Sequence, residues 1–255
     1  MIALTVVCSL FVGVGAASAY TVWNASQSAY PTTNPNGVWT YGFKLANADG
    51  SIGALENANV GGPCGFNTLL YQWERYGDSC PGYHGWITFN TGSSAYTTAW
   101  GVYWAPNGID MHPGQPITGE GGVILSASPT IRWTSPISDW VTVDASFAIY
   151  SGWGAPSGFV MHNEQTIYSV DMVGDATPGH VVGSPPYLPY GSFSQNVFVN
   201  AGDTLDITLT DGIDNNWGGD ATGITFRVTV PEPSSLLALG MGAMSLVGLI
   251  RRKRS

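Results

Sequence analysis

Hard oxygen donors lie close together in the segment TDGIDNNWGGDATG, residues 210–223. They are Asp211, Asp214, Asn215, Asn216 and Asp220. Carboxylate and amide oxygens are the ligands that Ca²⁺ prefers, and roughly six to eight of them at about 2.3–2.6 Å complete its shell. Oxygen-only ligation excludes softer metals. The segment therefore predicts a structural calcium ion held by its three aspartates.

The same residue types also build turns without a metal. Asp and Asn side chains hydrogen-bond to nearby backbone N–H groups, and Gly adopts positive φ values. The segment also lacks the glutamate that completes an EF-hand loop. A plain turn between two strands is therefore the alternative to calcium.

Trp217 lies in the middle of this polar segment. Sugar rings pack their C–H faces on exposed aromatic side chains, and neutral hydrogen-bonding groups beside them fix the orientation of the sugar. A polar segment offers Trp217 little core to enter. We therefore predict that Trp217, with Asn216 next to it, contacts a carbohydrate, whereas most of the ten tryptophans are expected in the core.

A second aromatic segment, WGVYW at residues 100–104, has the alternation of a strand. Trp100 and Trp104 then lie on one face and Tyr103 lies on the other. One face must be core, so burial of the tryptophans predicts an exposed Tyr103.

Catalytic motifs are absent from the sequence, which has no G-x-S-x-G, no H-E-x-x-H, no Walker loop and no G-x-G-x-x-G followed by a helix. A glycosidase needs only two carboxylates about 5–10 Å apart. The four glutamates between residues 20 and 230 are expected to be solvated or to pair with an arginine. They are Glu56, Glu74, Glu120 and Glu164. We predict a non-catalytic protein, and an extracellular glycan hydrolase is the alternative.

Alternating apolar and polar residues predict strands at WVTVDASFAI (140–149), DTLDITL (203–209) and TGITFRVTV (222–230). Weaker strand candidates are 38–45, 68–73, 85–90, 97–104, 122–133, 158–162, 166–173 and 192–199. Helical periodicity is almost absent. About ten strands separated by turn residues predict one all-β domain over residues 20–230, an antiparallel β-sandwich similar to a jelly roll.

Cys64 and Cys80 are the two cysteines of this domain. In an oxidising compartment they have one possible pairing, and closing the loop between them contributes roughly 3 kcal/mol. No histidine lies at ligand spacing from either cysteine, so zinc is not indicated. We predict a disulfide between them.

The charge of the domain limits its partners. Residues 20–230 hold four basic side chains against sixteen acidic ones. A protein needs Lys and Arg to neutralise the phosphates of nucleic acid. The composition therefore excludes nucleic acid and favours neutral ligands, cations or an extracellular matrix.

Both ends of the chain have the composition of targeting segments. Residues 1–19 are mostly apolar and end in Ala-Ser-Ala, which predicts a signal peptide. Residues 234–250 carry no charge, and as a helix they reach roughly 25 Å, enough for a thin bilayer. The basic cluster that follows predicts a cytoplasmic C-terminus, with the domain on the other side of the membrane. The cluster is Arg251, Arg252, Lys253 and Arg254.

The sequence VPEP at 230–233, the apolar span and the basic cluster together resemble the PEP-CTERM sorting signal of exported bacterial proteins. The resemblance covers residues 231–255. It implies that an exosortase, a membrane-embedded protease of Gram-negative bacteria, cuts at or near Pro231, Glu232 and Pro233. It also implies a membrane-anchored precursor, and a mature protein at the periplasm, the cell surface or outside the cell, where such bacteria make exopolysaccharide.

Two further stretches, NPNGVWTYGF (34–43) and the segment 200–228, resemble modules of exported PEP-CTERM proteins and carbohydrate-binding-like jelly rolls. This resemblance implies a sandwich fold and a sugar ligand. Together these observations predict a non-catalytic exported protein associated with exopolysaccharide or another carbohydrate. A purely structural matrix protein without a defined ligand is a further alternative.

Overall fold

A computed structural model describes ten stretches of the chain: 21–26, 32–46, 52–58, 60–63, 70–74, 85–97, 102–118, 124–150, 154–173 and 190–230. The chain divides into two units, and the strands belong to the unit Val22–Val230. The predicted signal peptide, the Cys64–Cys80 disulfide, the 234–250 span and the sorting residues lie outside the described stretches. No helix within those stretches has the length and apolar character needed to cross a bilayer.

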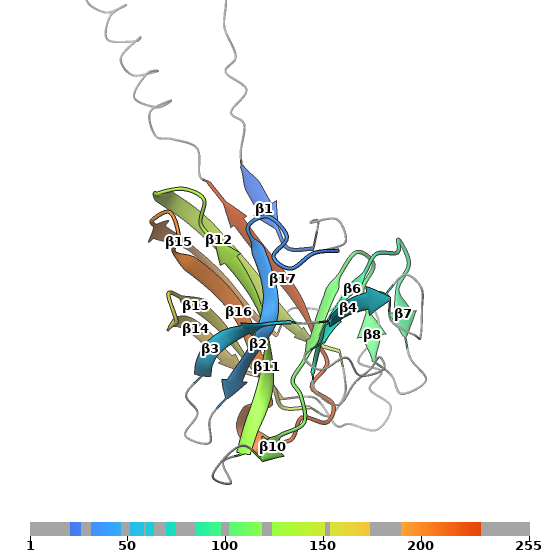
Figure 1. The fold of residues 1–255 in the computed structure, drawn as a ribbon. Coiled ribbons are helices and arrows are strands. Elements are labelled where there is room, and N and C mark those ends of the chain that lie inside the picture. Colours follow the sequence, from blue (N-terminus) through green and yellow to red (C-terminus); the bar gives the residue numbers. More distant parts are fainter. Residues whose placement is uncertain are drawn as a thin grey trace, which may run out of the picture. The chain divides into compact units, whose positions relative to one another are not determined.

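Two large antiparallel sheets form most of the described part of this unit, and a two-stranded sheet accompanies them (Figure 1). The first sheet contains, in spatial order, β15 (Gly191–Val199), β12 (Asp139–Ile149), β17 (Thr222–Thr229), β9 (Ile109–His112), β6 (Trp86–Asn90), β5 (Leu70–Glu74) and β4 (Val60–Pro63), and β1 (Val22–Asn24) pairs with β17. The second contains β14 (Gln165–Asp171), β13 (Ser157–His162), β16 (Thr204–Thr210), β11 (Ile124–Thr134), β2 (Trp39–Ala46) and β3 (Ile52–Asn57), and β10 (Ile117–Thr118) pairs with β11. The predicted antiparallel β-sandwich is confirmed.

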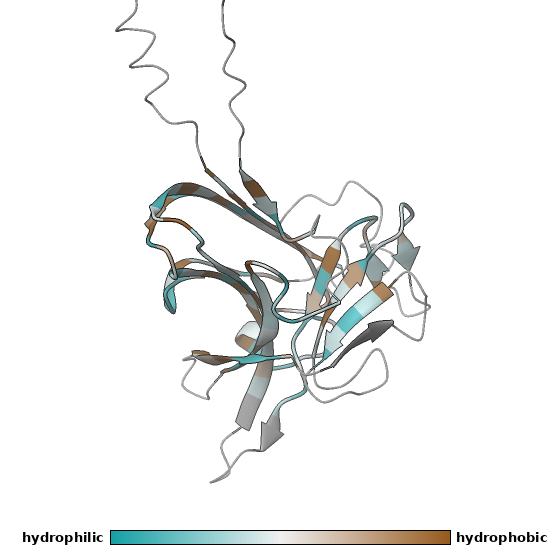
Figure 2. Ribbon diagram, turned by 45° about the horizontal axis from the view of Figure 1, so that its top comes forward, coloured by the Kyte–Doolittle hydropathy of each residue, from teal (hydrophilic) through white to brown (hydrophobic). Residues whose placement is uncertain are grey.

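Alternation along the strands builds the core between the sheets. On β12, Val141, Val143, Ala145 and Phe147 are buried, whereas the polar residues that alternate with them are only partly covered. The apolar positions of β16 and β17 join the same cluster. Figure 2 shows apolar and polar residues alternating along the sheets. The three strongest strand predictions are therefore confirmed, whereas strands of four residues or fewer, such as β1 and β4, are too short to show a period.

A short hairpin of β7 (Tyr96–Thr97) and β8 (Tyr103–Trp104) lies outside the main core. Trp104 packs with Leu70 and Tyr96, and Tyr103 packs edge-to-face on Tyr150, with ring centroids 5.3 Å apart. The prediction that Tyr103 is exposed is wrong, because both faces of this short strand are covered and Tyr103 is only 4% exposed.

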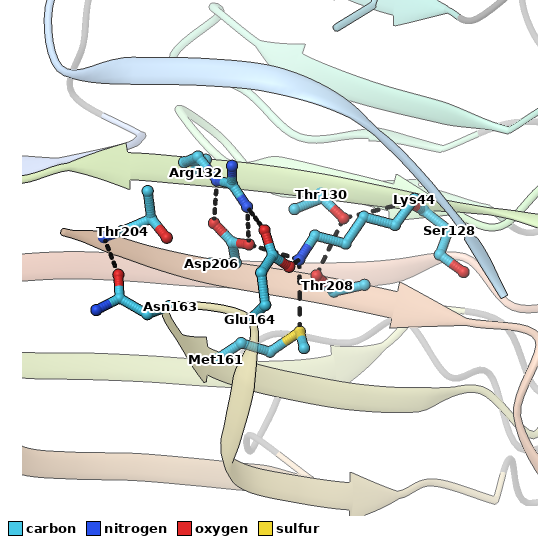
Figure 3. A network of polar contacts seen from close by, with 10 residues as sticks. All are labelled: Lys44, Ser128, Thr130, Arg132, Met161, Asn163, Glu164, Thr204, Asp206 and Thr208. Atoms are coloured by element: carbon cyan, nitrogen blue, oxygen red, sulfur yellow. Dashed lines mark hydrogen bonds and ion pairs between the residues drawn. The ribbon is translucent and has the colours of Figure 1, made fainter. Parts of the chain in front are cut away.

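A buried ion network ties the strands of the second sheet together (Figure 3). The carboxylate of Asp206 on β16 accepts two hydrogen bonds of 2.7 Å from Arg132 on β11, and it lies 2.7 Å from the ammonium group of Lys44 on β2. Glu164, in the turn between β13 and β14, contacts both cations. Lys44 and Asp206 are buried, so four elements are joined by one network.

Each charge of this network is compensated by its neighbours. The hydrogen bonds that Arg132 donates to Asp206 raise the pKa of Arg132. Burial alone would raise the pKa of Glu164, but the hydrogen bonds from Lys44 and Arg132 lower it overall. Beside the network, the hydroxyls of Thr130 and Thr208 pair at 3.0 Å on the same buried face. The polar face of β16 is therefore as buried as its apolar face, which the alternation of residues 203–209 did not indicate.

Replacing Asp206 with asparagine (D206N) removes the charge that Lys44 and Arg132 share. Leaving a buried charge without its partner costs about 3–5 kcal/mol, and we expect the lower end of this range because Glu164 remains. The measurement is the free energy of unfolding of the full chain in urea. The control is D144N, which breaks the exposed pair with Arg227 and should cost less than about 1 kcal/mol. Equal losses of unfolding free energy in D206N and D144N would contradict the stabilising role of the network.

Candidate functional site

The loop after β16 uses its exposed polar side chains in turns. A short 3₁₀ helix, Gly212–Asp214, is followed by Asn215 in the left-handed conformation, with φ of 52°. The carboxylate of Asp214 accepts a hydrogen bond of 3.1 Å from the N–H of Asn216, and the amide oxygen of Asn216 accepts one of 3.1 Å from the N–H of Gly218. The turn alternative therefore describes this part of the loop.

The other two aspartates of the loop are buried. Asp220 is fully buried, and one of its carboxylate oxygens accepts a hydrogen bond of 3.0 Å from the N–H of Ala155. Its second oxygen has no hydrogen-bond partner in the part of the chain that the structure describes. Burial, together with smaller contributions from the charges of Asp214 and Asp211, raises the pKa of Asp220 to about 8. Burial likewise raises the pKa of Asp211.

The three aspartates do not form a metal centre. In the described stretches, no group of three or more His, Cys, Asp or Glu side chains is placed so that it could hold a metal ion. Asp214 is exposed, whereas Asp220 is turned toward the backbone at Ala155. The positions of Asp211, Asp214 and Asp220 in the structure therefore do not support the calcium prediction.

Trp217 is partly buried and belongs to an aromatic stack. Its ring meets His112 edge-on, with centroids 5.9 Å apart, and His112 stacks on Trp86 with centroids 4.1 Å apart. The indole N–H of Trp86 donates a hydrogen bond of 2.8 Å to the carboxyl of Asp110. The Trp217 ring is thus in contact with another ring of the protein, whereas Asn216 beside it is exposed. A role of Trp217 in binding stays a prediction.

The stack leads to a row of buried polar side chains that the sequence did not reveal. Gln72, Thr88 and Asp110 lie directly opposite one another on β5, β6 and β9. Asp110 is fully buried, and burial raises its pKa well above the usual value. Burial lowers the pKa of His112 to about 4, and its Nδ1 lies 2.6 Å from the carbonyl of Pro113, to which it donates. His112 is therefore neutral at pH 7, and Asp110 keeps its proton to higher pH than an exposed aspartate does.

The described glutamates differ in exposure and in their hydrogen-bond and ion-pair partners. Glu164 pairs with Arg132, as expected, and Glu56 is exposed. Glu74 is only 6% exposed and accepts a hydrogen bond of 2.6 Å from the side-chain amide of Gln72. Glu74 is therefore not solvated, because the face of β5 opposite the core is also covered. Glu120 lies outside the described residues.

The outer face of β15, β12 and β17 is open to solvent. Trp140 on β12 and Phe198 on β15 are directly paired, with ring centroids 5.7 Å apart at an interplanar angle of 70°. Trp140 is 54% exposed and Phe198 is 46% exposed. Both residues occupy the polar positions of their strands, in phase with Asp144 and Ser194. An aromatic residue at a polar position was visible in the sequence and was the signal that our sequence reasoning missed.

Hydrogen bonds between neighbouring strands order the polar side chains of this open face. Thr142 donates to the amide oxygen of Asn196 at 2.8 Å, and Ser194 donates to the carboxylate of Asp144 at 2.6 Å. The guanidinium group of Arg227 donates to the second oxygen of Asp144 at 2.8 Å. The hydroxyls of Ser146 and Thr225 lie 2.7 Å apart. The open face therefore combines an aromatic pair with side chains that are already held in place.

Comparisons with known proteins bear mainly on the end of the chain. Residues 229–254 match the model of the PEP-CTERM protein-sorting motif. The chain carries a PEP-CTERM sorting motif. The motif indicates an exported protein that is processed at the membrane, as the sequence predicted. No curated protein matches the sequence.

Solved structures with a similar arrangement of strands include carbohydrate-binding modules. One is the module CBM51 from Clostridium perfringens in complex with methyl-galactose, with 15% identity, a TM-score of 0.32, and coverage of 56% of this chain and 87% of that one. A family 35 carbohydrate-binding module from Clostridium thermocellum has 15% identity, a TM-score of 0.25, and coverage of 53% and 97%. The K2 adhesin domain of Lys-gingipain has 9% identity, a TM-score of 0.39, and coverage of 83% and 100%. Because these TM-scores are low, the fold is defined by the strand pairing of this structure and not by the comparisons.

Replacing Asp220 with asparagine (D220N) is expected to flatten the dependence of stability on pH. Asp220 has a pKa of about 8 in the folded protein and an ordinary low pKa when unfolded. Between these two values the folded chain binds a proton that the unfolded chain does not, so stability falls as pH rises through this range. The asparagine of D220N keeps an oxygen that can accept a hydrogen bond from the N–H of Ala155, but it does not bind or release a proton in this pH range. The melting temperature of the wild type should therefore fall more between pH 5 and 9 than that of D220N.

Thermal unfolding of the full chain at several pH values is the measurement, and D139N, at an exposed aspartate, is the control. If the melting temperature of D220N changes with pH as much as that of the wild type, Asp220 does not bind this proton. The same melts with calcium and with a chelator test the loop again. If calcium raises the melting temperature of the wild type but not that of D220N, the loop binds a metal ion through Asp220.

Proposed function

We propose that the protein is an exported carbohydrate-binding protein that is sorted by an exosortase and associates with exopolysaccharide through the open face. The observation that carries the proposal is the exposed pair of Trp140 and Phe198 beside ordered polar side chains. Exposed aromatic rings together with a few placed hydrogen-bonding groups suit sugar rings, which are apolar on their faces and polar at their edges.

The exposure of Trp140 is unusual within this protein. Five of the described tryptophans are 5% exposed or less, and Trp140 is 54% exposed. They are Trp39, Trp73, Trp86, Trp104 and Trp133. Large apolar side chains left in water at neighbouring positions mark interaction sites more often than isolated ones do. The contrast favours a binding role for the pair with Phe198.

The proposal includes no catalytic step. The carboxyl groups of Asp110 on β9 and Glu74 on β5 are buried, at 0% and 6% exposed. A polymer on the surface would not reach these groups. On the open face, Asp144 is engaged by Ser194 and Arg227. A binding protein fits these contacts better than a glycan hydrolase does.

The sorting motif completes the proposal. An exosortase would cut near Pro231, Glu232 and Pro233 after residues 1–19 have directed export and the apolar span has halted in the inner membrane. The mature domain would then remain in the periplasm or move to the cell surface or beyond. Its acidic composition suits a neutral matrix, because the domain has few cations to bind acidic polymers.

Replacing Pro231, Glu232 and Pro233 with alanine tests the sorting step in the producing bacterium. We expect the variant to accumulate as the full-length precursor in membranes, because the protease loses its recognition sequence, whereas the wild type is shortened. Immunoblots of membrane, periplasmic and medium fractions measure this, with I213A as a control in the folded domain. Identical processing of the variant and the wild type would contradict the exosortase assignment.

Retention on immobilised exopolysaccharide tests the binding step. The double variant W140A/F198A should lose about tenfold or more in affinity, because the two exposed rings would form the centre of the contact. I213A removes another exposed apolar side chain, 62% exposed, and should bind like the wild type. W217A distinguishes the two candidate surfaces. Loss of retention in W217A with full retention in W140A/F198A would place binding at the loop and contradict the use of the open face.

A further inference from the structure

The open face has an aromatic residue at each end. Trp140 and Phe198 lie at one end of the β12–β15 ladder, and Tyr190, which is 50% exposed, immediately precedes the other. Gly191 faces the interior next to Tyr168 and Val170, so the preceding residue, Tyr190, is placed on the outer side. The N–H of Tyr190 donates a hydrogen bond of 2.7 Å to the carbonyl of Phe147, which holds it against the sheet.

The strip between these aromatics is continuous. The ladder runs from Asp139 opposite Val199 to Phe147 opposite Gly191, and its register does not shift. At about 3.4 Å per residue, the eight steps from Tyr190 to Phe198 correspond to about 27 Å along the strands. Two strand spacings from β15 to β17 add a width of roughly 10 Å. This shape suits a long and narrow ligand that lies along the strands.

The strip is electrically balanced. Its charged side chains between the two ends are Asp144 and Arg227, which neutralise each other. The remaining side chains on the outer face of this part of the ladder are hydroxyls and an amide. They are Thr142, Ser146, Ser192, Ser194, Asn196, Thr225 and Thr229. An acidic polymer would meet no unpaired cation within this strip and would approach a chain with an excess of acidic residues.

From this geometry, and resting on the proposed function, we infer that the open face binds an extended, uncharged polysaccharide chain that lies along β12 and β15. One segment of the polymer packs on Trp140 and Phe198, and a segment several sugars away packs on Tyr190. The hydroxyls and the amide between the two ends hydrogen-bond to the sugar hydroxyls. Because these side chains are already held by cross-strand hydrogen bonds, little conformational entropy is lost when they bind.

The experiment uses the full chain and a defined panel of linear polymers: uncharged β-glucans and β-mannans, and the acidic polymers alginate and polygalacturonate. For each uncharged polymer that is retained, oligosaccharides of two and six sugars are titrated by calorimetry. We expect the six-sugar ligand to bind about tenfold tighter than the two-sugar ligand, because only the longer one reaches both ends. We expect acidic polymers to bind more weakly than uncharged ones.

Variants at the two ends separate the contributions. Y190A should reduce the affinity for the six-sugar ligand to the level of the two-sugar ligand and leave the latter unchanged. W140A should weaken both, and I213A should weaken neither. Melting temperatures check that each variant is folded, and sedimentation checks for pairing of two chains through Trp140 and Phe198.

The possible results distinguish the inference from the proposed function. If no polymer is retained, the proposed function fails and the inference fails with it. If glycans bind but the two lengths have equal affinity, or if acidic polymers bind tighter, the proposed function stands and the inference is overturned. If W140A abolishes self-association while glycan binding persists, the open face is an interface between two copies of the chain, which also overturns the inference.

Discussion

The second sheet depends on the ion pairs that the carboxylate of Asp206 forms. This carboxylate balances the charges of Lys44 and Arg132, which lie on two other strands. Both cations also contact Glu164 and so hold the turn between β13 and β14. A buried charge is tolerated only when a partner and hydrogen bonds replace water. Since the pairing joins residues more than 70 positions apart, it also favours one arrangement of the strands over others.

This network also affects the surface. The described basic side chains are Lys44, Arg132 and Arg227, and each forms an ion pair with an acidic residue. An acidic chain that pairs its few cations internally has little attraction for polyanions. Under the proposed function, this pairing of cations disfavours polyanions as partners of the first sheet.

The two halves of the first sheet are used in opposite ways. Over β5, β6 and β9, the face turned away from the core is covered, and the carboxyl group of Asp110 loses water and has a raised pKa. Over β12, β15 and β17, the same kind of face is open, and Trp140 and Phe198 remain in contact with solvent. Burial therefore removes the polar side chains of the first region from solvent, whereas exposure makes those of the second available to a ligand.

The sequence alone determined the all-β class, the strands at 140–149, 203–209 and 222–230, and the sorting motif, because a period of two and a contiguous motif are local properties. Only the tertiary structure decided which polar faces are covered. That choice buried Asp110 and Asp206, kept Asp211, Asp214 and Asp220 from forming a metal centre, and placed Trp140 beside Phe198. Alternation separates the two faces of a strand, but what covers each face depends on residues that are distant in sequence.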